Sequence, residues 1–140
     1  MSTRYKVLGQ LAGSYSSAQT LYTVPTSSLF RYGDRASNLR KAIVSSVIVT
    51  NLNLDDAIKY SMAVVPSGES VSSEHYIVKD YQINAVREDG DWLNFVPNTH
   101  LVSLDLTLDP GAYISFQVTD PADDTKAASV KFNAFGAEIF

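Results

Sequence analysis

The segment Val102–Asp109, with the sequence VSLDLTLD, decides the fold class, because its even residues are apolar and its odd residues are polar. Successive side chains of a β-strand point to opposite faces of a sheet, so this segment predicts a strand with one apolar and one polar face. The same alternation occurs in residues 58–64, 114–119 and 129–134. A dominant period of two is typical of antiparallel sheets that cover a core with one face.

Four further segments have strand composition without such clean alternation: 5–8, 20–24, 42–50 and 76–83. Among them, Ala42–Thr50 is nearly continuous β-branched apolar sequence. It predicts a strand buried on both faces, either central in a sheet or at a subunit contact. Pro, Gly, Asn and Asp residues fall between the strand candidates and predict turns. We expect Asp109–Gly111 to form a short hairpin between 102–108 and 112–119.

About eight strands in 140 residues predict one all-β domain spanning residues 1–140, a single antiparallel β-sandwich of jelly-roll type. No helical stripe is longer than two turns, and the best helix candidate is Arg35–Arg40. Two segments fall outside the strand pattern, and both predict long loops, which are often functional. They are the basic, aromatic segment Ser27–Lys41 and Val86–His100, which contains the acidic turn Glu88–Asp91.

The composition excludes several classes of function. The formal charge of −4 lacks the basic character of a general nucleic-acid binder, and no polybasic run favours an anionic membrane. The absence of cysteine excludes disulfides and thiolate chemistry. Because Met1–Gln10 has no apolar secretory region and no apolar run approaches membrane-spanning length, we expect a soluble protein made in the cytoplasm.

Motifs of catalysis and metal binding are absent from the sequence. His75 and His100 lack the spacing of a zinc site or a catalytic triad, and we expect both to be structural or exposed. The acidic turn Glu88–Asp91 could bind calcium but lacks the spacing of a calcium loop, so a solvated turn is preferred. The same holds for the pairs Asp55–Asp56 and Asp123–Asp124. We therefore predict no enzyme activity, no cofactor and no metal, with a hydrolase using paired carboxylates as a distant alternative.

Aromatic and basic residues in the two long loops are the candidate interface, because Tyr, Trp and Arg are enriched where proteins meet. The candidates are Phe30, Arg31, Tyr32, Arg35, Arg40, Trp92 and Phe95. The alternative is that such aromatics, together with Tyr15, fill the ends of the core. The two loops carry opposite charge, and they could pair within one chain or between copies.

Six short strings, read in order, resemble those of small virion structural proteins from tailed bacteriophages, including marine and cyanobacterial phages. The strings are Lys6–Gln10, Thr20–Pro25, Ser46–Asn51, Met62–Glu69, His75–Ile77 and Phe135–Ile139. The resemblance implies a β-sandwich that assembles in symmetric copies on the virus particle, with no catalytic residues to carry over. Leu29–Lys41 and Arg87–Pro97 are longer than the usual connections of that group, so contacts built on them would be particular to this chain.

The expected function is therefore that of a virion structural protein, made in the host cytoplasm, that self-associates on the particle exterior. We expect a capsid decoration or cement protein, with a trimer and the major capsid protein as partners, and no nucleic acid or membrane. A neck, tail, baseplate or fibre-attachment position is the alternative within this class. A carbohydrate-binding or adhesion module, with Trp92 and Tyr32 as its platform, is the alternative from another class.

Overall fold

The computed structural model of the chain describes residues 3–25, 41–86 and 98–139, and β-strands dominate it. The strands are β1 (Thr3–Ala12), β2 (Gln19–Thr23), β3 (Lys41–Asn51), β4 (Ile58–Val65), β5 (Tyr76–Ile83), β6 (Thr99–Leu108), β7 (Tyr113–Asp120) and β8 (Val130–Ile139). A 3₁₀ turn, η2 (Ser73–His75), and a short helix, α1 (Asp124–Ala127), complete the described elements. Each of the eight predicted segments overlaps one of these strands, so the all-β prediction is confirmed.

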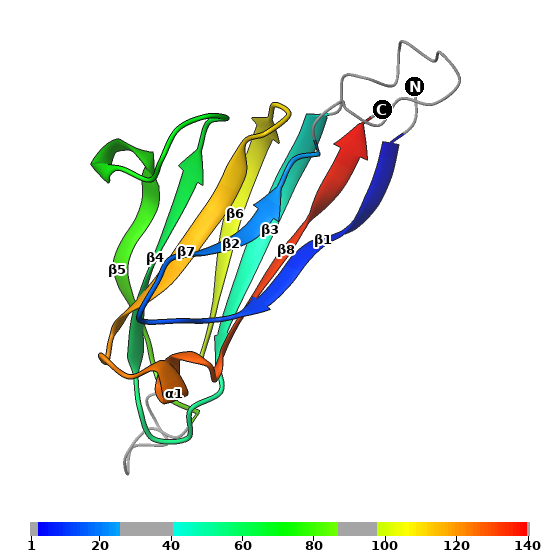
Figure 1. Ribbon diagram of the computed structural model, residues 1–140. Helices are drawn as coiled ribbons and strands as arrows, with labels where there is room; N and C mark the ends of the chain where they lie inside the picture. The colour runs from blue at the N-terminus through cyan, green and yellow to red at the C-terminus, as the bar shows by residue number, and fades with distance from the viewer. Residues whose placement is uncertain (1–2, 26–40, 87–97, 140) are drawn as a thin grey trace.

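The strands form two four-stranded antiparallel sheets with the orders β1-β8-β3-β6 and β2-β7-β4-β5 (Figure 1). Pairing is nested along the chain: β1 pairs with β8, β2 with β7, β3 with β6 and β4 with β5. The two sheets share one hydrophobic core, as the predicted sandwich requires. Within it, the rings of Phe116 on β7 and Phe132 on β8 stack across the sheets with their centroids 3.7 Å apart.

The central position of β3 is confirmed, because it lies between β8 and β6. Within one chain it is buried on one face only, because residues such as Ile43 and Ile48 on its outer face are only partly buried. Burial of that outer face at a subunit contact stays a prediction. A register shift between Val44 and Ser46 changes which face the following residues occupy. This bulge places Val44 and Val47 on the same buried face and explains why the sequence of the strand does not alternate.

The predicted hairpin at Asp109–Gly111 is also wrong. Strand β6 belongs to one sheet and β7 to the other, so this turn carries the chain across the core. Gly111 has φ +86° and donates its N–H to the carbonyl of Val24 at 3.0 Å. Both strands alternate in the same way, and alternation does not reveal which sheet a strand joins.

The predicted long loop Val86–His100 ends earlier than expected, because β6 begins at Thr99 and includes His100. The helix candidate Arg35–Arg40 lies outside the described residues. Among residues 3–25, 41–86 and 98–139, no helix has the length and apolar character needed to cross a membrane.

Candidate functional site

All seven predicted interface residues, Phe30, Arg31, Tyr32, Arg35, Arg40, Trp92 and Phe95, lie outside the described residues, as does the acidic turn Glu88–Asp91. The described residues that flank the two segments lie at opposite ends of β3. Lys41 begins this strand opposite Ile139, whereas Asn51 ends it opposite Val130. Ten residue steps along a strand span roughly 33 Å. The end of the sandwich at which β3 finishes is called the Asn51 end below.

At the Asn51 end, one buried amide joins the loop that follows β3 to the residue that follows β5. Asn51 is 0% exposed, and its Nδ2 donates to the carbonyl oxygens of Asp56 at 2.9 Å and Asn84 at 3.2 Å. Its Oδ1 accepts from the backbone N–H of Asn53 at 3.0 Å and from Asn53 Nδ2 at 2.8 Å. Buried polar groups are costly unless paired, and this amide is paired through both its nitrogen and its oxygen.

The same network holds both flanks of residues 87–97. Asn51 donates its backbone N–H to the carbonyl of Asn98 at 2.9 Å, and Asn98 Nδ2 donates back to the carbonyl of Asn51 at 3.0 Å. On the other flank, the backbone N–H of Val86 donates to the carbonyl of Asn53 at 2.9 Å. Asn51 and Asn53 therefore fix the positions of Asn98 and Val86, the two residues that flank 87–97.

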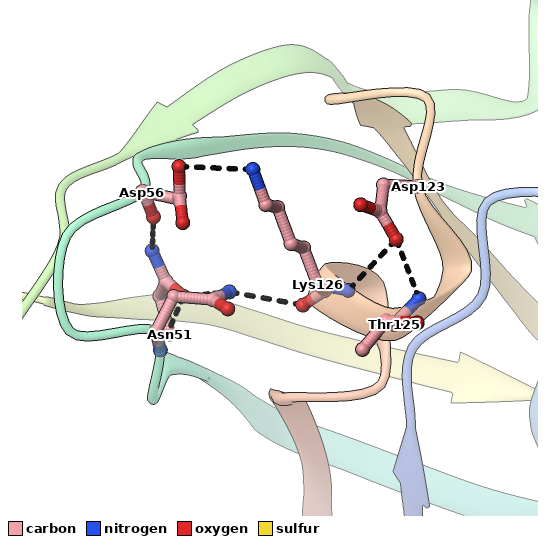
Figure 2. Close-up of polar contacts among 6 residues, drawn as sticks. Asn51, Asp56, Asp123, Thr125 and Lys126 are labelled. Carbon is pink, nitrogen blue, oxygen red and sulfur yellow. Dashed lines mark hydrogen bonds and ion pairs between the residues drawn. The ribbon is translucent and has the colours of Figure 1, made fainter.

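Helix α1 lies at this end of the sandwich (Figure 1), and Figure 2 shows the polar contacts that hold it there. Lys126 Nζ lies 3.2 Å from Asp56 Oδ1, and the Lys126 carbonyl accepts from Asn53 Nδ2 at 2.9 Å. Asp123 caps the helix by accepting from the backbone N–H groups of Thr125 and Lys126. The pairs Asp55–Asp56 and Asp123–Asp124, expected to be solvated turns, therefore include side chains with defined structural partners.

Asp124 fastens the serine-rich turn Ser14–Ser17 to the same end. Its Oδ1 accepts from the backbone N–H groups of Tyr15 at 2.9 Å and Ser16 at 3.0 Å, and from Ser14 Oγ at 3.2 Å. The hydrogen bonds from Ser16 and Tyr15 favour the carboxylate and lower the pKa of Asp124 below its ordinary value. The backbone carbonyl of Tyr15 in turn accepts from Gln117 Nε2 at 2.7 Å.

A histidine and two tyrosines lie together where β6 of one sheet faces β4 and β5 of the other. The hydroxyl of Tyr60 on β4 lies 2.6 Å from Nδ1 of His100 on β6. The ring of Tyr81 on β5 stacks on the imidazole at 3.9 Å and remains 47% exposed. Burial lowers the pKa of His100, so the neutral imidazole is favoured.

Exposed apolar side chains gather around the Asn51 end and the adjoining edge of β6. Leu52 and Leu54 follow β3, Val86 borders residues 87–97, and Leu101 lies on β6 with 61% of its surface exposed. Exposed apolar groups near a rigid polar framework are typical of protein interaction surfaces. The sequence did not indicate these residues, because the exposure of each depends on which elements the fold places beside it.

At the opposite end, a carboxylate is buried between the sheets. Glu138 on β8 is 5% exposed, and its Oε2 accepts from the Tyr22 hydroxyl on β2 at 2.7 Å. Its Oε1 lies 2.5 Å from Lys6 Nζ on β1. The charge is therefore paired, as burial of a carboxylate requires, and the interaction links β1, β2 and β8.

One group of three side chains within the described residues has ligand atoms close enough to hold a metal ion: Glu69, Glu74 and His75. His75 Nε2 lies 3.5 Å from Glu69 Oε1, and His75 Nδ1 accepts from the backbone N–H of Ser72 at 3.1 Å. In the neutral ring this places the proton on Nε2, which then faces Glu69. A metal-bound histidine donates from its other ring nitrogen, so this geometry favours a hydrogen-bonded turn over a metal centre.

No protein-family model matches the chain, and no curated protein matches it significantly.

Proposed function

We propose that the chain is a structural virion protein of a tailed bacteriophage that self-associates on the particle exterior, most specifically as a capsid decoration or cement protein. The six ordered strings that resemble such proteins support this proposal. The β-sandwich described above agrees with the fold that the resemblance implies.

The arrangement at the Asn51 end is the observation that best supports a binding role. A fully paired buried amide fixes the flanks of residues 87–97, and exposed Leu52, Leu54 and Val86 surround it. Rigid frameworks that present variable segments and apolar groups are a common design for recognition surfaces. The two segments proposed as contacts start from opposite ends of the sandwich, which favours contacts with different neighbouring molecules over pairing within one chain.

We also infer that the sandwich is a jelly roll. Its strands pair first with last, second with seventh, third with sixth and fourth with fifth. Such nesting is what results when one long antiparallel ribbon wraps around a core, and capsid domains commonly have this architecture. The trimer expected from the sequence stays an untested prediction, and the two-fold contact proposed below is an alternative to it.

Deletion of the gene from the phage tests the proposed function. We expect particles with normal tails whose heads lose resistance to heat, because a cement protein stabilises contacts between capsid subunits. Re-supply of the purified protein should restore that resistance. Heads of unchanged stability whose tails fail to join or adsorb would instead assign the chain to the neck or tail. Binding to a glycan array by particles of normal stability would favour the adhesion alternative.

A further inference from the structure

Strand β6 is the outermost strand of its sheet and pairs only with β3 among the described strands. The three other outermost strands carry features that discourage a further strand from pairing. Strand β1 has a bulge at Val7–Gly9 and the charged Lys6, and β2 is only five residues long. Strand β5 has two register shifts and a residue at positive φ, Asp80.

The first half of β6 lacks such protection. Residues Thr99–Ser103 pair with β3 in continuous register, and the irregularity of this strand begins only beyond Ser103. No side chain from Thr99 to Ser103 is acidic or lysine, and burial favours neutral His100. Leu101, at the centre of this run, is 61% exposed, more than any other large apolar side chain in the described residues.

We propose that two copies of the chain pair edge to edge through β6, antiparallel about a two-fold axis at Leu101. This inference rests on the self-association proposed above and names its surface. The axis places Leu101 opposite the partner's Leu101 and Thr99 opposite the partner's Ser103. Because none of these side chains is charged, the strand is complementary to itself without like charges facing each other.

The proposed pairing would supply partners for the backbone of β6 and would bury more of its apolar side chains. Alternate residues of an outermost strand point their N–H and C=O groups away from the sheet, and a second β6 would supply partners for them. The inward-facing Val102 and Leu104 are only partly buried although they pack on the core. A neighbouring strand would cover them further and join two four-stranded sheets into one of eight strands.

Sedimentation of the full chain across a concentration series tests the contact. We expect the wild type to reach about twice the monomer mass of 15.3 kDa, and Leu101→Lys to shift at least tenfold toward monomer. Two lysines would then face each other across the axis. Val7→Lys is the matched control, because Val7 is 45% exposed but lies on β1, at the opposite edge of the same sheet. A variant L101K that self-associates like the wild type would overturn the proposal.

Cysteine cross-linking tests the position of the axis, since the chain has no native cysteine. Opposed residues in an antiparallel pair have Cα atoms about 4.5–5.5 Å apart, within reach of a disulfide. Leu101→Cys should therefore form a covalent dimer rapidly on mild oxidation. Thr99→Cys should not form this dimer, because the axis places residue 99 opposite residue 103 of the second copy, about four residues away from residue 99 of that copy.

The outcomes separate the edge contact from the proposed function. A wild-type chain that is monomeric in solution and also absent from the particle would contradict both. Oligomers in which T99C and L101C cross-link equally slowly would contradict the β6 contact alone and leave self-association through another surface. A trimer in sedimentation would likewise overturn the two-fold contact while supporting self-association.

Discussion

The Tyr60 hydroxyl and the His100 imidazole join the two sheets through a 2.6 Å contact, with β4 on one side and β6 on the other. Burial, with a smaller contribution from Tyr81, raises the pKa of Tyr60, so its hydroxyl keeps the proton. A protonated hydroxyl and a neutral imidazole share one hydrogen bond here, whose direction depends on which ring nitrogen of His100 carries the proton. His100, which the sequence predicted to be structural or exposed, makes a cross-sheet contact on β6, the outermost described strand of its sheet.

The lowered pKa of His100 makes stability depend on pH. Between the lowered pKa of the folded state and pH 6.5, the ordinary value for histidine, the unfolded chain binds a proton at this residue that the folded chain does not bind. Stability from this group is therefore present above pH 6.5 and is lost as pH falls through the folded pKa. Urea unfolding at pH 8 and pH 5.5 should show lower stability at the acid pH.

The variant His100→Gln should reduce that difference, because it removes the titrating group. His75→Gln is the control, since His75 lies at η2 and contacts neither Tyr60 nor Tyr81. A pH dependence that is unchanged in H100Q but lost in H75Q would contradict the assignment to His100.

Replacing Asn51 with Ala should destabilise the fold by about 3 kcal/mol, because several buried backbone groups lose their partner at once. Asn51→Asp should cost at least as much, since a carboxylate would face the carbonyl oxygens of Asp56 and Asn84. Thermal and urea unfolding measure both effects. Asn133→Ala removes an amide that accepts only an exposed contact from Gln10 and should cost less than about 0.5 kcal/mol. Equal losses at positions 51 and 133 would show that the network contributes little.

Tyr22→Phe should cost about 2 kcal/mol, since it removes a buried hydrogen bond to the Glu138 carboxylate. Tyr113→Phe is a matched control, because the Tyr113 hydroxyl donates an exposed hydrogen bond to the Glu69 carbonyl. Equilibrium unfolding of the two variants compares them directly. A smaller loss in Y22F than in Y113F would contradict a stabilising role for the cross-sheet contact.

Gly136→Ala should destabilise the pairing of β8 with β3 by roughly 3 kcal/mol, because a Cβ at this position would collide with the backbone carbonyl of Ile43. Gly68→Ala should cost about 1 kcal/mol, since its site is open and only its positive φ opposes a side chain. Differential scanning calorimetry measures both. A G136A protein as stable as G68A would mean that the two strands can separate without cost.

The local sequence predicted the strands well, because the alternation of apolar and polar side chains can be read from consecutive residues. It did not predict that 102–108 and 113–120 belong to different sheets, since alternation is the same in either sheet. The sequence did not predict the hydrogen bonds of Asn51 either. This residue appeared only as the last one of the string Ser46–Asn51, and its partners Asn84 and Asn98 are distant in sequence. The exposure of Leu101 depends on β6 being outermost, which only the strand order reveals.

The predicted contact residues, from Phe30 to Phe95, lie in segments outside the described residues, so their role stays a prediction. What the described structure adds is the fixed geometry of their flanks and a different contact surface on β6. The two features differ in exposure, so Asn51→Ala should mainly lower stability, whereas Leu101→Lys should mainly weaken self-association.

The position of the chain in an image of the intact particle tests the proposed function most directly. Electron cryo-microscopy of the wild-type phage, compared with the deletion mutant, should reveal additional density of sandwich shape, repeated by symmetry on the exterior of the head. Neighbouring copies should be joined through β6. Particles that contain no density for this chain, on head or tail, would contradict the assignment of the protein as a virion component.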